Sequence, residues 1–151
     1  MKLRSSSGFT LIELLLVIGI IAILASIVIV AINPTKQLGD ARDAQRRSDV
    51  NTILNAVYQY AIDNNGTLPS DISTTETEIC RGSTEPASCS TDEGVNLRML
   101  TGAYLVSIPA DPQAVSTSTG THYTILKDSS GRITVRAWGT EQEETDISVT
   151  R

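Results

Sequence analysis

The chain has 151 residues, with 12 lysines and arginines against 17 aspartates and glutamates, and a net charge of −5. This length suits one small domain with an anchor and excludes a two-domain enzyme. The acidic balance leaves no basic stripe to replace the counterions of phosphates, which excludes a protein that coats nucleic acid.

The N-terminal segment has the charge pattern of a membrane anchor. Lys2 and Arg4 precede the apolar run, and positive charge there keeps this end in the cytoplasm. Residues 14–35 contain no charged side chain. As a helix, residues 14–32 are about 29 Å long, close to a hydrocarbon core of about 30 Å. The run is longer than that of a secretory signal peptide, and no Ala-x-Ala site follows it. We therefore predict one membrane-inserted helix.

Glu13 lies inside this apolar block, between Ile12 and Leu14. An ionised carboxylate costs on the order of 2.5–3.5 kcal/mol at the centre of a membrane helix, and less near its end. Such residues usually have a partner. We therefore interpret Glu13 as a functional residue.

The hexapeptide Gly-Phe-Thr-Leu-Ile-Glu that ends at Glu13, set between a short basic leader and an apolar run, resembles the recognition site of the type IV pilin and pseudopilin family. The resemblance implies that a prepilin peptidase cleaves between Gly8 and Phe9 and methylates the new N-terminal Phe9. Residues 1–8 would be the leader, and residues 9–32 the transmembrane and assembly helix. It also implies that Glu13 pairs with the Phe9 amine of a neighbouring subunit, which offsets the cost of burying each charge alone.

A second helical segment follows a break in the pattern. Asn33 and Pro34 interrupt the helix, because proline lacks a backbone donor and disfavours helix at the preceding residue. Apolar residues then recur on one face, at positions 50, 53, 54, 57, 58 and 61. They predict an amphipathic helix over residues 33–64, with a stop signal in the Asn-Asn-Gly at 64–66.

The charged stretch of residues 42–49 lies on this helix. We interpret it as a solvated face with intrahelical pairs, since Asp43 can reach Arg46 and Arg47 at helical spacing. The alternative places Arg46 or Arg47 against acidic groups of a neighbouring subunit. The Asp-Asn-Asn-Gly-Thr-Leu-Pro run at 63–69 also resembles the family, with leucine where an aromatic residue is common.

Residues 65–112 are interpreted as an αβ-loop region. The part at 70–93 is rich in Ser, Thr and acidic residues and predicts a surface loop. Residues 97–105 predict a short helix or an extended stretch. A double-proline connector follows at 108–112, in which Asp111 caps backbone donors. This connector resembles the one that precedes the sheet in the family.

The αβ-loop region contains Cys80 and Cys89, the only cysteines of the chain. In an exported protein such a pair predicts a disulfide that closes a short loop. A zinc site is the alternative, but the only histidine, His122, is distant in sequence and does not complete a zinc set. The spacing is also not the Cys-x-x-Cys of redox catalysts.

Residues 113–151 predict a small C-terminal β-sheet. Residues 122–127 and 132–138 alternate as strands around a four-residue hairpin loop, and Ile147 with Val149 supplies a third strand. One face of the second strand is apolar and carries Ile133, Val135 and Ala137. The predicted fold class is therefore α+β, with a long kinked N-terminal helix packed against an antiparallel sheet of two to three strands.

No phosphate-binding loop, nucleophile elbow or clustered His/Asp/Glu set is present, so we predict no enzyme activity and no cofactor. Calcium in the head is known for some pseudopilins, and the C-terminal region offers oxygen ligands. No spacing matches a calcium loop, so we interpret these residues as a solvated acidic cluster: Asp128, Glu141, Glu143, Glu144 and Asp146.

The resemblance implies a structural subunit of a type IV pilus or pilus-like filament. Its partners would be further copies of itself, the prepilin peptidase, the assembly platform with its ATPase, and the membrane before assembly. The precursor would span the cytoplasmic membrane once, with its leader inside, and the filament would stand at the cell surface. The alternative is a pseudopilin of a type II secretion or DNA-uptake (competence) system. A third class is a membrane-tethered binding module. No basic, aromatic-interleaved patch supports nucleic-acid binding.

Overall fold

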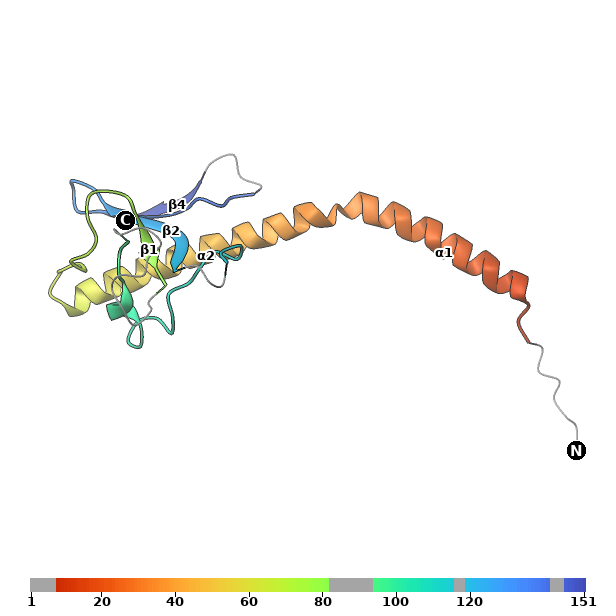
Figure 1. Cartoon of the computed structure of the whole chain (residues 1–151), viewed down its shortest axis with the longest axis horizontal. Helices are drawn as coiled ribbons and strands as arrows, with labels where there is room; N and C mark the ends of the chain where they lie inside the picture. The colour runs from red at the N-terminus through yellow and green to blue at the C-terminus, as the bar shows by residue number, and fades with distance from the viewer. Residues whose placement is uncertain (1–7, 82–93, 116–118, 142–145) are drawn as a thin grey trace, which may run out of the picture. The chain divides into compact units, whose positions relative to one another are not determined.

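The computed structural model describes residues 8–81, 94–115, 119–141 and 146–151. The chain forms two compact units, Met1–Leu38 and Gly39–Arg151. In chain order (Figure 1) the elements are α1 (Leu11–Ile32), α2 (Pro34–Asp63), β1 (Thr77–Cys80), the 3-10 helix η1 (Arg98–Leu100), β2 (Gly120–Lys127), β3 (Ile133–Ala137) and β4 (Ile147–Thr150). The α+β class predicted from the sequence is confirmed.

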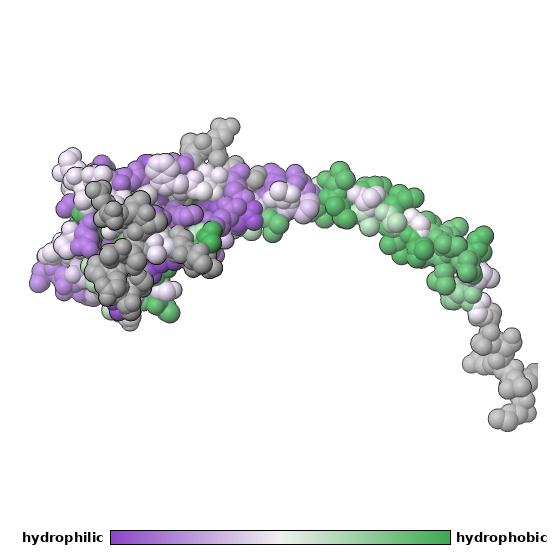
Figure 2. Space-filling view, viewed as in Figure 1, coloured by the Kyte–Doolittle hydropathy of each residue, from purple (hydrophilic) through white to green (hydrophobic). Residues whose placement is uncertain are grey.

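The first unit consists of α1 and the start of α2. A capping box begins α1, because the Thr10 hydroxyl accepts a hydrogen bond from the Glu13 amide while the Glu13 carboxylate accepts one from the Thr10 amide. No residue of α1 is buried. Figure 2 shows apolar colour over the surface of this helix. A helix that is apolar all round requires lipid or other apolar helices around it, and its length and composition suffice to cross a membrane.

The interruption predicted at Asn33 and Pro34 is confirmed as a break of one residue. Asn33 ends α1 in the left-handed conformation, with φ 46° and ψ 76°. Pro34 occupies the first position of α2, where its missing N–H is not needed. The Asn33 side chain accepts a hydrogen bond from the Lys36 amide at 3.3 Å, which restarts the helical pattern.

The second unit contains a four-stranded antiparallel sheet in the order β1-β2-β3-β4. The prediction of two to three strands was one strand short, because Thr77–Cys80 lies in the stretch interpreted as a surface loop. This strand has only four residues, and the Ser, Thr and Glu residues around it in the sequence hide its alternation of polar and apolar side chains. Backbone pairing with β2 and a bridge from Ile79 to Val95 hold it in the sheet. Residues 97–105, predicted as a short helix or extended, contain the single turn η1.

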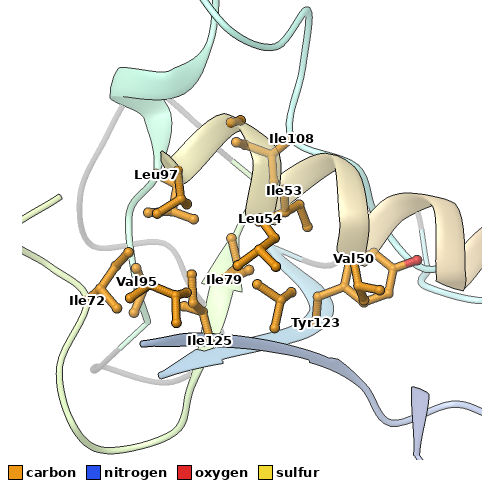
Figure 3. Close-up of a cluster of buried hydrophobic side chains, with 14 of the residues drawn as sticks. Val50, Ile53, Leu54, Ile72, Ile79, Val95, Leu97, Ile108, Tyr123 and Ile125 are labelled. Atoms are coloured by element: carbon orange, nitrogen blue, oxygen red, sulfur yellow. The ribbon is translucent and has the colours of Figure 1, made fainter. Parts of the chain in front are cut away.

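The core lies between one face of α2 and one face of the sheet. Val50, Ile53 and Leu54 of α2 are fully buried and pack with the inward side chains of the strands, among them Tyr123 and Ile125 (Figure 3). The apolar face predicted for the second hairpin strand is confirmed, since Ile133, Val135 and Ala137 are fully buried. Residues outside α2 and the strands also belong to the cluster, among them Ile72, Leu97 and Ile108.

Candidate assembly segment and head ion network

The segment before α1 is open to a processing enzyme. Gly8 and Phe9 precede the helix in irregular backbone, and the Phe9 side chain is 86% exposed. Nothing lies within 4 Å of where a Cβ on Gly8 would stand. An exposed, non-helical peptide bond is the form in which proteases meet their substrates. The Gly8–Phe9 bond is therefore accessible in the described chain, while its cleavage remains a prediction.

Glu13 lies one helical turn beyond this bond. One of its oxygens, Oε2, accepts hydrogen bonds from the Thr10 amide at 2.8 Å and the Thr10 hydroxyl at 2.7 Å. An anion is favoured there, because the first turn of a helix carries unpaired N–H groups. Among the described residues, Oε1 has no hydrogen-bond donor. The carboxylate is thus held in place through one oxygen, and its pairing with a neighbouring subunit stays a prediction.

The second unit, Gly39–Arg151, is called the head from here on. It contains a buried ion network that is centred on Arg46. The Arg46 side chain is 0% exposed, and its Nε donates to Asp111 Oδ2 at 2.6 Å. Its Nη1 donates to Asp43 Oδ1 at 2.7 Å, and its Nη2 to Gln113 Oε1 at 3.0 Å. Glu141 accepts a further bond from Nη1 at 3.2 Å. One guanidinium thus ties α2 to two segments that are distant in sequence.

The interpretation of residues 42–49 as a solvated face is therefore wrong at its centre. Asp43 and Arg46 do form the expected intrahelical pair, but both side chains are buried in the head. The alternative of a neighbouring subunit is also wrong for Arg46, because its donors are used within its own chain. For Arg47 that alternative stays a prediction. The partners Asp111 and Glu141 lie too far along the chain for helical spacing to indicate them.

Asp111 has the capping role predicted for it and a second role besides. Its Oδ1 accepts from the Gln113 amide at 2.7 Å, as an Asx turn requires. Both oxygens also accept from Arg46. The connector after Ile108 is fixed on α2 by this pair. A separate buried contact lies nearby, in which the Tyr123 hydroxyl donates to Asp49 at 2.8 Å, and burial raises the pKa of Tyr123.

Glu141 accepts two bonds from the guanidinium of Arg42 and one from Arg46, which lower the pKa of its carboxyl from 4.5 to about 2. Because the pKa is depressed on folding, the contribution to stability is complete above pH 4.5 and lost as the pH falls towards 2. We expect Glu141→Gln to flatten the pH dependence of unfolding within this window. Urea unfolding at several pH values measures it.

The hairpin residue Asp128 provides the comparison for that experiment. Hydrogen bonds from Ser130 and Arg132 lower the pKa of Asp128, so acid sensitivity remains in Glu141→Gln and falls further when Asp128→Asn is added. An unchanged pH profile in Glu141→Gln would contradict the role given to Glu141.

The predicted acidic cluster is not one site. Asp128 belongs to the hairpin and Glu141 to the ion network, while Asp146 is exposed. Glu143 and Glu144 lie outside the described residues. Across the part of the chain that the structure describes, no group of three or more His, Cys, Asp or Glu side chains could hold a metal ion. The interpretation as a solvated cluster is wrong for Glu141.

The predicted disulfide joins a described residue to one that is not described. Cys80 is the last residue of β1 and is nearly buried. Cys89 lies outside the described residues, so the pairing of Cys80 with Cys89 stays a prediction.

Comparisons with known proteins identify a family model and two relatives that are similar to this chain. Residues 3–29 match the family model of the prokaryotic N-terminal methylation motif. The type II secretion system core protein G of Aeromonas hydrophila is 42% identical over 65 residues, which cover 43% of this chain and 44% of that protein. The protein of the same name from Vibrio cholerae serotype O1 is 32% identical over 111 residues, which cover 74% of this chain and 68% of that protein. No solved structure matches the chain.

Proposed function

The chain belongs to the type IV pilin and pseudopilin family, and from this we propose that it is a pseudopilin, a structural subunit of the filament of a type II secretion apparatus. The family is one of structural subunits and not of enzymes. The methylation motif is common to pilins and pseudopilins. The observation that carries the proposal is the alignment of 111 residues with the Vibrio protein, which exceeds the two helices and includes part of the head.

In this proposal the precursor is first inserted into the cytoplasmic membrane. The apolar helix α1 spans the cytoplasmic membrane, with Lys2 and Arg4 on the cytoplasmic side and the head on the other. A prepilin peptidase cleaves the exposed bond between Gly8 and Phe9 and methylates the new amine. Cleavage removes the basic leader and leaves a cationic amine close to the turn that contains Glu13.

Assembly then moves α1 from lipid into a bundle of neighbouring α1 helices. Both surroundings are apolar, so hydrophobic burial alone does not favour the exchange. Side-chain packing and one polar pair therefore determine whether the exchange is favourable. The open oxygen of Glu13 accepts the Phe9 amine of the next subunit, and the platform and ATPase of the apparatus supply the work of extraction.

We expect Gly8→Val to block processing, because a branched side chain replaces a residue that leaves the bond uncovered. Intact mass and N-terminal sequencing of membrane-extracted protein measure the effect. The unaltered chain should begin at methylated Phe9 and the variant at Met1. Gly19→Ala is the matched control, since nothing lies within 4 Å of a Cβ at this position, and it should be processed normally. An unaltered chain that begins at Met1 would refute processing and favour the tethered module.

The pilus remains the second candidate, because the methylation motif supports both filaments equally. Deletion of the gene separates them. A pseudopilin predicts loss of protein secretion in cells without long surface filaments. A pilin predicts loss of filaments that can be sheared from the cell surface, with secretion unchanged.

A further inference from the structure

The face of the sheet opposite the core carries a pocket of about 340 Å³. It is lined by residues of the two adjacent strands β1 and β2 and of the segment after β3: Glu78, His122, Thr124, Trp138 and Gly139. They include the only histidine and the only tryptophan of the chain. The volume lies at the lower end of the range for small-molecule sites. This pocket has no part in the proposed assembly of the filament.

Trp138 is held in a fixed position although it is 58% exposed. Its Nε1 donates to Thr124 Oγ1 at 3.1 Å, and the Thr124 hydroxyl donates to Glu76 at 2.6 Å. The guanidinium of Arg136 lies 5.9 Å from the centre of the indole ring and pairs with Glu76 at 3.2 Å. Polar contacts, and not burial, therefore orient this ring. A fixed and exposed aromatic face is suited to stacking against a ligand.

Glu78 lines the same pocket as Trp138. Its carboxylate rests against Gly120, a residue of β2 that has no side chain. Its Oε1 accepts a hydrogen bond from the His122 amide at 3.0 Å. A Cβ on Gly120 would stand 2.1 Å from the same oxygen. Glycine thus leaves the space in which the carboxylate rests. Within the described residues the second oxygen, Oε2, has no hydrogen-bond donor, so it can accept one from a bound molecule.

His122 adopts a strained backbone conformation at the same place. Its φ is 62°, in the left-handed region that non-glycine residues seldom enter within a strand. The pairing of β1 with β2 shifts register between Glu78 and Cys80, next to this residue. Such irregularities occur preferentially where a side chain is aimed at a binding site. Here the bulge places the imidazole at the rim of the pocket.

We propose that this pocket binds a neutral sugar ring of a glycan. An anion is disfavoured by the charge of Glu78, and a second cation is disfavoured by the positive charge of Arg136, whose guanidinium lies 5.9 Å from the centre of the indole ring. A pyranose ring has an apolar C–H face that can stack on Trp138. Its hydroxyl groups can donate to Glu78 and exchange hydrogen bonds with His122. One ligand of this class therefore suits the indole, the carboxylate and the imidazole together.

The single tryptophan makes the test direct, because tryptophan emission, excited at a wavelength that the four tyrosines do not absorb, reports on Trp138 alone. The full-length chain is purified in a polyoxyethylene detergent, which carries no sugar, and titrated with cellohexaose, maltohexaose and chitohexaose. We expect a saturable change in the emission of Trp138 with at least one of these glycans. No change with any of the three, or a change with tetramethylammonium chloride alone, would overturn the proposal.

Two variants then test the carboxylate. Glu78→Gln removes its charge, and Gly120→Ala displaces it while every lining side chain is kept. Each should weaken glycan binding by about tenfold or more, the loss expected for a charge-assisted hydrogen bond. Ser148→Ala, an exposed change on β4, is the control and should bind normally. Circular dichroism confirms that each variant is folded. Equal affinities for all three variants would refute the assignment of Glu78.

Discussion

Replacement of Arg46 with methionine is expected to lower the free energy of unfolding of the head by about 3–5 kcal/mol, the usual cost of removing one partner from a buried ion network. The variant leaves Asp43 and Asp111 buried without their shared cation. It also removes the bonds that hold the connector on α2 at Asp111, and one of the bonds that hold Glu141 there, while Arg42 still pairs with Glu141. Methionine retains the unbranched apolar stem of the side chain, so that most of the loss reports on charge and hydrogen bonding.

The measurement is urea unfolding of the full-length chain in detergent at neutral pH, followed by the fluorescence of Trp138. Arg132→Met is the matched control, because Arg132 forms an ion pair at a side chain that is 65% exposed. We expect this control to lose less than about 1 kcal/mol. Adding Asp111→Asn to Arg46→Met should recover part of the loss by removing one uncompensated charge. Similar stabilities for Arg46→Met and Arg132→Met would show that the network is not a main support of the head.

Replacement of Glu13 with glutamine is expected to reduce filament assembly by about tenfold or more, while insertion and processing continue. Glutamine retains an oxygen that can accept from the Thr10 amide, so the helix cap persists and only the charge is lost. Loss of one ion pair worth about 1.4 kcal/mol already changes an equilibrium tenfold. Quantification of sedimentable filament against membrane-bound subunit measures the effect.

Thr10→Ala is the control for this experiment, because it removes the hydroxyl that caps α1 and retains the charge of Glu13. It should assemble far better than Glu13→Gln. Normal filaments from Glu13→Gln would refute the pairing of Glu13 with the amine of a neighbouring subunit.

The elements with a regular pattern were predictable from the sequence. The apolar run of α1, the helical face of α2 that includes Val50 and Val57, and the alternation of β3 each repeat with the period of their element. The break at Asn33 was also predictable, because proline acts on its immediate neighbour. In these places local sequence determines the local structure.

The ion network and the fourth strand depend on contacts that no local pattern records. Arg46 occurs in a charged stretch that is typical of a solvated helix face, and only the arrival of Asp111 and Glu141 makes it a buried residue. In β1 a single fully buried residue, Ile79, is too short a signal to stand out from Ser, Thr and Glu neighbours. The left-handed backbone of His122 lies beside the register shift between β1 and β2, and the strand alternation of residues 122–127 does not indicate it.

The order of the elements along the chain has a consequence for how the head folds during synthesis. The apolar face of α2 is made early, but the strands that cover it come last, because β2, β3 and β4 all follow residue 119. Arg151 completes the enclosure, since its amide bonds to Ile133 and its side chain to Asn55 of α2. A nascent chain that stops before β2 therefore exposes an uncovered apolar helix face, a state prone to aggregation. Closure of this head therefore follows the synthesis of β4.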